Sequence, residues 1–167
     1  ILIYGYVVLL IGILIGAYMF LQTGLPLLYI GLFGIISATL YYKFKYVALG
    51  DVVIFLSFAL LPMLGLVYVM TGMIDWWSLL VASPIGLLIV AILHANNTRD
   101  MLQDKEAKIK TQAMNLGLEG SQVFYQTLLL ISYMLVAFIV LFHVLHPLVF
   151  AVLITIPIAL KNIKLMK

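Results

Sequence analysis

Residues 76–106 read WWSLLVASPIGLLIVAILHANNTRDMLQDKE, an apolar run that passes directly into the most polar stretch of the chain. A helix rises about 1.5 Å per residue, so roughly 20 apolar residues cross the roughly 30 Å hydrocarbon core of a bilayer. The run 76–94 has this length, and Trp76 and Trp77 at its start favour a membrane interface. This stretch therefore predicts a transmembrane helix whose far end carries polar side chains.

The composition of the whole chain requires the same environment. Of its 167 residues, 66% are hydrophobic and only 9% are charged, and the mean hydropathy is +1.25. Soluble domains are about half apolar and about a quarter charged, so a water-soluble globule is excluded. Lipid admits only structures that satisfy their backbone hydrogen bonds internally, which favours helices. The chain has no cysteine, so neither a disulfide framework nor a thiolate metal site is available.

Apolar runs of this kind occur six times along the chain, at 1–21, 25–42, 52–71, 76–94, 123–142 and, less completely, 148–160. We predict an all-α fold, a polytopic bundle with six transmembrane spans. No repeat, linker or low-complexity segment divides residues 1–167, so a single domain is expected. Because the chain starts at Ile1, inside an apolar run and without a polar leader, we expect it to be truncated.

The charges indicate how the spans are oriented. If the spans alternate in direction, the 41–51 loop, the 95–121 loop and the C-terminal tail share one membrane face. All nine basic residues and all acids except Asp75 fall there, and the basic ones are Lys43, Lys45, Arg99, Lys105, Lys108, Lys110, Lys161, Lys164 and Lys167. Basic residues in short loops mark the cytoplasmic side. We expect the loops to be cytoplasmic in a bacterial cytoplasmic membrane, and the charge to be a topology signal rather than a nucleic-acid footprint.

Three side chains with oxygen atoms recur at four-residue spacing at the end of the fourth span. Asn96, Asp100 and Asp104 would lie along one face of a helix that continues out of the membrane. Two carboxylates and an amide carbonyl suit Mg²⁺, which proteins usually hold with one or two carboxylates plus substrate phosphates. The forked guanidinium of Arg99 suits phosphate oxygens. The alternative is a charged loop that is simply solvated, with its acids paired to Arg99 or Lys108.

This register, in the setting HANNTRDMLQDKEAKIKTQAMNLG, resembles the second aspartate-rich motif of the UbiA superfamily of membrane prenyltransferases. The segment FKYVALGD at 44–51 resembles the corresponding loop in the menaquinone branch, which contains dihydroxynaphthoate prenyltransferases and animal menaquinone-4 synthases. The resemblance covers roughly residues 25–130. It implies a fold of nine membrane helices with two facing aspartate-rich motifs, of which this chain carries about helices three to eight and lacks the first motif.

The resemblance also implies an activity. Such an enzyme transfers a polyprenyl group from an allylic diphosphate to an aromatic quinone precursor, here 1,4-dihydroxy-2-naphthoate, by Mg²⁺-assisted ionisation of the diphosphate. With half of the metal site missing, residues 1–167 alone should be inactive. The expected partners are the two substrates and the lipid bilayer.

Residue roles follow by position in the motif. Asn96, Asp100 and Asp104 would bind the metal, the two aspartates being catalytic, and Arg99 and Lys45 would contact the diphosphate. Many relatives carry Gly where this chain has Lys108, and bacterial enzymes often carry Lys where it has Ile109. The phosphate-binding lysine is therefore expected at Lys108 or Lys110. Asp51 would lie near the aromatic acceptor.

A second class of function is a small transporter or channel subunit with an ion-binding acidic loop. Its signature is an ionisable residue in the middle of a span, where such residues are costly and mark ion pathways. The span interiors of this chain lack them. His94, at a span end, is expected to be a hydrogen-bonded structural residue.

Overall fold

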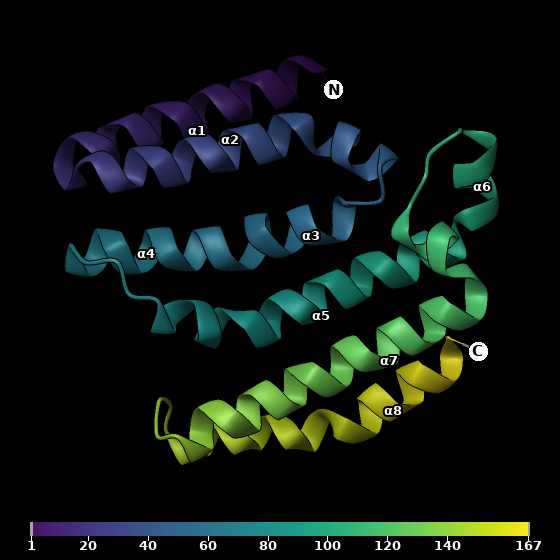
Figure 1. Cartoon of the computed structure of the whole chain (residues 1–167). Coiled ribbons are helices and arrows are strands. Elements are labelled where there is room, and N and C mark those ends of the chain that lie inside the picture. Colours follow the sequence, from purple (N-terminus) through teal and green to yellow (C-terminus); the bar gives the residue numbers. More distant parts are fainter. Residues whose placement is uncertain (1, 167) are drawn as a thin grey trace.

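The computed structural model describes residues 2–166, which form helices joined by short turns and contain no strand (Figure 1). The elements are α1 (Leu2–Thr23), α2 (Leu25–Tyr46), α3 (Gly50–Phe55), η1 (Leu56–Leu60), α4 (Leu61–Thr71), α5 (Trp77–Arg99), α6 (Met101–Glu106), α7 (Gln112–Leu141), η2 (Pro147–Thr155) and α8 (Ile156–Leu165). The segments α3, η1 and α4 form one continuous span, as do η2 and α8.

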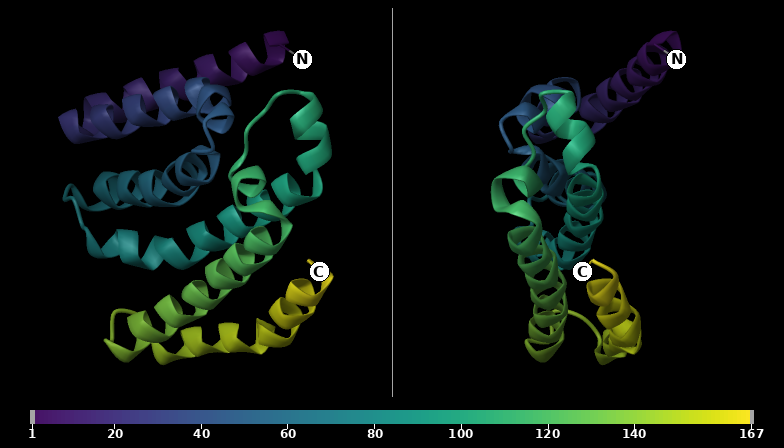
Figure 2. Two further views of the ribbon diagram at one scale, coloured as in Figure 1. Left: turned by 45° about the vertical axis from the view of Figure 1, so that its right-hand side comes forward. Right: turned by 90° about the vertical axis from the view of Figure 1, so that its right-hand side faces the viewer.

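Six helical segments are long and apolar enough to cross a membrane, which confirms the predicted all-helical, six-span architecture. Successive spans run in opposite directions and lie side by side (Figure 1). Two further views show that the spans form a curved layer in chain order (Figure 2). In the most apolar stretch of the first and of the last span no residue is buried, whereas 39% of the residues in that stretch of α5 are buried. The packed centre of the bundle therefore lies around α5.

The core is the interface between α5 and α7. Val90 and Ala91 of α5 are buried against three residues of α7, which are Tyr125, Leu128 and Leu129. Small residues on α5 let the two helices approach closely, which is how membrane helices pack where lipid removes the hydrophobic driving force.

The third span contains a π-helical segment, Leu56–Leu60. Leu61 donates its N–H to the carbonyl of Leu56, five residues back. Pro62 explains the wider turn, because it has no N–H and its ring collides with the carbonyl four residues before it. The sequence pattern predicted this span but not its local widening.

The fifth span begins earlier than predicted. Helix α7 starts at Gln112 rather than near 123, and Thr111 caps it by accepting a hydrogen bond from the N–H of Met114 at 3.4 Å. Gly117 has φ 68°, a left-handed value that breaks the helix, and Ser121 donates across the break to the carbonyl of Ala113. The predicted 95–121 loop is therefore mostly helical.

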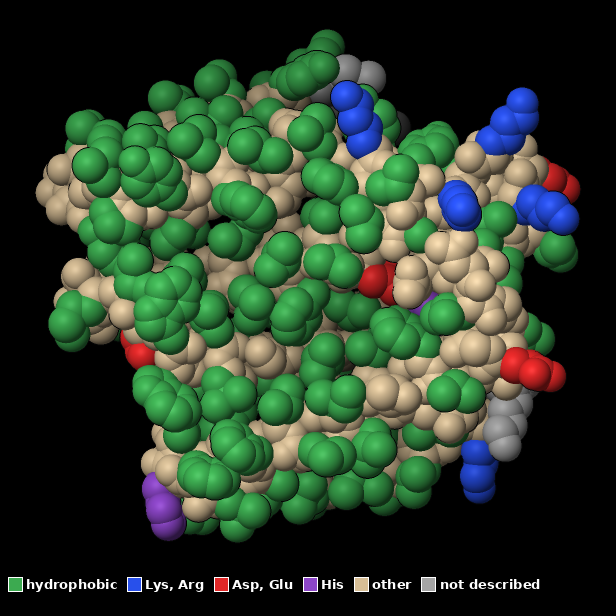
Figure 3. Space-filling view, viewed as in Figure 1, with side chains coloured by type: hydrophobic (Ala, Val, Ile, Leu, Met, Phe, Trp, Pro, Cys, Tyr) green, Lys and Arg blue, Asp and Glu red, His purple; other side chains and the backbone are tan. Residues whose placement is uncertain are grey.

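The predicted grouping of the loops holds. The end of α2, the start of α3, helix α6 and the end of α8 lie at one end of the layer (Figure 1). The basic side chains and most of the visible acidic ones lie toward this charged end, while hydrophobic side chains predominate over the rest of the visible face (Figure 3). Asp75 lies in the turn between α4 and α5, at the opposite end. Lys167, counted with the basic residues above, lies outside the described residues.

We expect the substitution Gly86→Ala to destabilise the protein by about 1–3 kcal/mol, the usual cost of overpacking. A Cβ on Gly86 would lie 2.5 Å from Cβ of Ala59 and 2.7 Å from the ring of Phe55, so α5 would have to move away from the π segment. Thermal unfolding in detergent measures the effect. Gly31→Ala is the control, because its Cβ would meet nothing within 4 Å; an equal loss in both variants would contradict this packing.

Candidate functional site

An ion pair links two elements at the charged end. Lys45, in the last turn of α2, places its Nζ 3.6 Å from Oδ1 of Asp104 in α6. The Asp104 side chain is only 10% exposed and that of Lys45 is 27% exposed. The second carboxylate oxygen, Oδ2 of Asp104, is buried and has no hydrogen-bond partner among the described residues. A buried, unpaired carboxylate oxygen is costly, so this atom suits an added ligand.

Two turns bring these residues together. The N–H of Ala48, after α2, donates to the carbonyl of Lys110, before α7, at 3.1 Å. Ala48 and Lys108 have φ of 59° and 56°, the left-handed conformation that glycine adopts most easily. The turns therefore fold back on each other and carry α6 over the end of α2.

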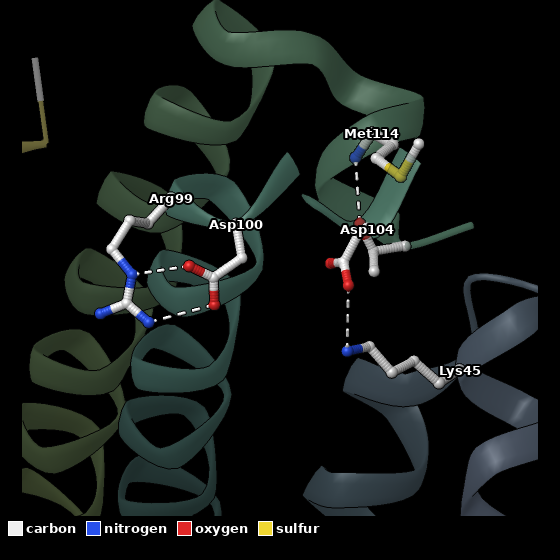
Figure 4. A network of polar contacts seen from close by, with 6 residues as sticks. Lys45, Arg99, Asp100, Asp104 and Met114 are labelled. Carbon is white, nitrogen blue, oxygen red and sulfur yellow. Dashed lines mark hydrogen bonds and ion pairs between the residues drawn. The ribbon is translucent and has the colours of Figure 1, made fainter. Parts of the chain in front are cut away.

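A second ion pair lies beside the first but points elsewhere. Nε of Arg99 donates to Oδ1 of Asp100 at 2.7 Å, and its Nη2 donates to Oδ2 at 3.0 Å. These hydrogen bonds hold the pKa of Asp100 below its usual range. The Arg99 side chain is 71% exposed, so the pair faces outward. Figure 4 shows Asp100 turned toward Arg99 and Asp104 turned toward Lys45.

The side chains of the three expected ligands, Asn96, Asp100 and Asp104, do not converge in this structure. Their backbone register is present, since Asp100 N–H donates to Asn96 O and Asp104 N–H donates to Asp100 O, both at 2.9 Å. However, α5 ends at Arg99 and Asp100 leaves the helical conformation, with φ −92° and ψ 9°. The Asn96 side chain is exposed. Within residues 2–166, no group of three or more His, Asp or Glu side chains lies close enough together to hold a metal ion.

Only some of these side chains are placed so that they could bind Mg²⁺. The free Oδ2 of Asp104 is the kind of oxygen that this ion prefers. Both oxygens of Asp100 are occupied by Arg99. Asp104 therefore fits as one ligand, and the described residues do not complete a site.

A buried carboxylate–imidazole pair lies between α3 and α5. Oδ2 of Asp51 is 3.0 Å from Nδ1 of His94, whose side chain is fully buried. The His94 ring packs edge-on against Phe124 of α7, with ring centroids 4.7 Å apart. His94 is thus hydrogen-bonded, as expected. The partner of Asp51 was not predicted, because only the fold brings positions 51 and 94 together.

The remaining predicted phosphate ligands lie at the surface. Lys108 and Lys110 are exposed, and neither forms an ion pair with any residue in 2–166. Both belong to the turn between α6 and α7, where Lys110 contributes its carbonyl to Ala48. Their ammonium groups are free to meet an anion but are not held in place.

Two cavities lead away from the charged end. A larger one of about 820 Å³ lies between α1, α2 and the third span, and a smaller one of about 440 Å³ lies between α2, α3 and η1. They share Gly34, Ala38 and Ser57 as lining residues. On α2, Ser37 and Tyr41 line the smaller cavity and are followed by Lys45, so these three share a helix face at four-residue spacing. The two cavities adjoin each other, and Lys45 follows Tyr41 along the same face of α2, although neither Lys45 nor Asp104 lines a cavity.

Comparison with known proteins agrees with the membrane architecture. The UbiA prenyltransferase family matches residues 1–166. UbiA prenyltransferase domain-containing protein 1 of Rattus norvegicus is 39% identical over 131 residues, which are 75% of this chain and 39% of that protein. The Danio rerio protein of the same name is 45% identical over 114 residues, 66% of this chain and 33% of that protein. A Drosophila melanogaster homologue is 42% identical over 114 residues.

The chain spans between 31% and 39% of the length of these relatives. All three are animal proteins, so they give no support to the expected bacterial source. The match favours an enzyme over the transporter alternative. No solved structure matches the chain significantly.

We expect Lys45→Met to lower stability by about 1–3 kcal/mol, between the values typical of exposed and of buried ion pairs. The substitution leaves the buried Asp104 carboxylate without its cation. The double variant Lys45→Met/Asp104→Asn should recover part of the loss, because no buried charge is left unpaired. Thermal unfolding in detergent gives the double-mutant cycle. Lys43→Met, at an exposed position on the same helix, is the control, and strictly additive losses at 45 and 104 would contradict the pairing.

Proposed function

The chain belongs to the UbiA prenyltransferase family, and from this premise we propose that it is part of a membrane enzyme that transfers a polyprenyl group from an allylic diphosphate to an aromatic quinone precursor. One observation carries the proposal. The α2 face that lines the smaller cavity with Ser37 and Tyr41 continues to Lys45, whose partner Asp104 is a buried carboxylate at the charged end.

This arrangement matches the shape of a polyprenyl diphosphate. Transfer of its hydrocarbon tail out of water is favourable, whereas its anionic head must stay hydrated or contact cations. The larger cavity has apolar walls apart from the single hydroxyl of Ser57, which suits the tail. Lys45 and Arg99 lie at the end of the bundle where the head would remain. The substrate would therefore lie along the membrane normal, with its head at the charged end.

The charged side chains have different proposed roles. Lys45 and Arg99 would bind diphosphate oxygens, and the exposed Lys108 and Lys110 would attract the anion to the site. Asp104 would bind Mg²⁺ directly through its free Oδ2. Asn96 and Asp100 are proposed as further ligands once their side chains turn toward Asp104, which for Asp100 means releasing Arg99. Bound Mg²⁺ would neutralise charge that develops on the leaving diphosphate.

The chemistry is the substitution of one carbon–oxygen bond by one carbon–carbon bond. The bond between C1 of the prenyl group and the diphosphate oxygen breaks, and the diphosphate keeps the electron pair. A ring carbon of the acceptor then attacks C1, and the ring regains aromaticity when the substituent at that carbon leaves without its bonding electrons. The cations around the diphosphate stabilise the charge that it gains.

More specifically, we propose that the enzyme acts in menaquinone biosynthesis and that its acceptor is 1,4-dihydroxy-2-naphthoate. It is supported by the resemblance of residues 44–51 and 96–104 to that branch. Asp51 is proposed to help define the acceptor region through its buried pair with His94, which fixes the start of α3 against α5. We also propose that the chain is one part of a longer enzyme, whose other part supplies the first aspartate-rich motif.

The full-length enzyme should transfer a labelled prenyl group to 1,4-dihydroxy-2-naphthoate in liposomes only when Mg²⁺ is present. Asp104→Asn should lower kcat by about 100-fold or more, the scale for losing one electrostatic contact to a transition state. Asp100→Asn should also lower kcat strongly. Asp75→Asn, at the opposite end of the bundle, should leave the rate unchanged. Residues 1–167 alone should show no turnover.

Two results would reject this mechanism. The first is turnover by the unaltered enzyme after complete chelation of divalent cations. The second is near wild-type turnover by the Asp104→Asn enzyme, provided that it unfolds at the same temperature as the unaltered protein.

We further propose that the charged end is cytoplasmic, because the basic residues gather there. A cysteine placed at position 108 should be shielded from a membrane-impermeant thiol reagent in intact cells, whereas one at position 73, in the turn after α4, should react. The chain contains no other cysteine, although the rest of the full-length protein must be made cysteine-free. Labelling at 108 but not at 73 would reverse the orientation.

A further inference from the structure

The smaller cavity differs in chemistry from the larger one. Eight residues line it, and three of them carry hydroxyl groups, namely Ser37, Tyr41 and Ser57. The larger cavity has 22 lining residues, of which only Ser57 has a hydroxyl. The hydroxyl groups are thus concentrated around the 440 Å³ of the smaller cavity rather than around the larger one. Cavities of a few hundred Å³ with few polar groups among apolar walls are typical of small-molecule sites.

Ser57 is the most informative of the three. Its Oγ is buried and has no hydrogen-bond partner among the described residues. Other hydroxyl side chains in the spans satisfy themselves by donating to the carbonyl four residues back: Thr23, Thr39, Thr71, Ser83, Thr98, Thr127 and Ser132. Ser57 lies in the π segment, where backbone pairing shifts to the fifth residue. An unpaired buried hydroxyl is costly, and a ligand that pairs with it removes that cost.

The position of the smaller cavity narrows the choice of ligand. It lies next to the larger cavity and shares Gly34, Ala38 and Ser57 with it. The Tyr41 hydroxyl lies 3.6 Å from where a Cβ would stand on Gly50, the residue before Asp51. The remaining walls are apolar and include Val53 and Phe58. A molecule here would touch both the reacting end of a tail in the larger cavity and the start of α3.

We propose that the smaller cavity binds the hydroxylated aromatic acceptor, with Ser57 and Ser37 hydrogen-bonded to its ring hydroxyl groups. This inference rests on the proposed prenyl transfer and adds to it the place and the recognition of the second substrate. Apolar walls accept the faces of one or two fused rings, and the serines pair with the ring's polar edge. The π segment has a function in this account, because it presents Ser57 unpaired at the junction of the two cavities.

Steady-state kinetics of the full-length enzyme with 1,4-dihydroxy-2-naphthoate and a prenyl diphosphate test the assignment. Ser57→Ala and Ser37→Ala should each raise KM for the naphthoate about 3- to 10-fold, the effect of losing one neutral hydrogen bond. KM for the prenyl diphosphate should not change. Ser83→Ala is the matched control, since Ser83 is a half-buried serine that already donates to the carbonyl of Leu79 at 2.7 Å. Gly31→Leu, which narrows only the larger cavity, should raise KM for the prenyl diphosphate instead.

Acceptor analogues that lack one ring hydroxyl distinguish the loss of a hydrogen bond from a change in packing. With 1-hydroxy-2-naphthoate and 4-hydroxy-2-naphthoate, each lacking one ring hydroxyl, at least one analogue should bring the KM ratio between Ser57→Ala and unaltered enzyme close to 1. Ser37→Leu, which fills the smaller cavity, should abolish acceptor use while labelled prenyl diphosphate still binds.

The outcomes separate this inference from the proposed function. If the unaltered enzyme transfers no prenyl group, the proposed function fails. If it does transfer one but the acceptor KM is unchanged in both alanine variants, or Ser37→Leu keeps normal acceptor use, the acceptor assignment alone is overturned.

Discussion

An unpaired polar group inside a bilayer costs several kcal/mol, and this cost determines where each polar side chain of the chain lies. Most Ser and Thr hydroxyl groups in the spans donate a hydrogen bond to a carbonyl of their own helix, as Ser83 does. The carboxylate of Asp51 meets His94, and that of Asp104 meets Lys45. Three buried side-chain atoms of the described residues have no hydrogen-bond partner, namely Oγ of Ser57, Oδ2 of Asp104 and Nε2 of His94. Ser57 borders both cavities and Asp104 lies at the charged end, so we infer that these two of the three atoms meet a substrate and an ion.

The features that depend on the bilayer could be predicted from the sequence. Span length and loop charge gave the six helices and the common end for positions 45 and 104, since both follow from hydrophobicity summed over many residues. Features set by single backbone distortions could not. The π segment follows from Pro62, whose effect depends on how the chain relieves its clash. Asp100 leaves the helical conformation and its carboxylate pairs with Arg99, so it points away from Asp104 although the backbone register continues. The Asp51–His94 pair needs helix packing across 43 residues of sequence.

The break at Asp100 also explains how so many charges coexist at one end of a small bundle. It separates two neighbouring carboxylates, one toward the exposed Arg99 and the other toward the half-buried Lys45. Each charge is then neutralised by a cation that the proposed mechanism assigns to the diphosphate. Arrival of an anion with its metal ion would exchange these partners, with arginine and lysine passing to phosphate and the carboxylates to the metal. Such an exchange keeps charges paired throughout, which a low-dielectric boundary favours.

The central claim is that the cavities and the Lys45–Asp104 pair form one substrate site at the charged end. A structure of the full-length enzyme in lipid nanodiscs, with Mg²⁺ and a prenyl thiodiphosphate that ionises slowly, tests it most directly. The account predicts density for the diphosphate in contact with Lys45 and, through the ion, with Asp104, and density for the tail between α1, α2 and α4. A diphosphate bound elsewhere, with Lys45 and Asp104 still paired to each other and the cavity filled by lipid, would contradict the account.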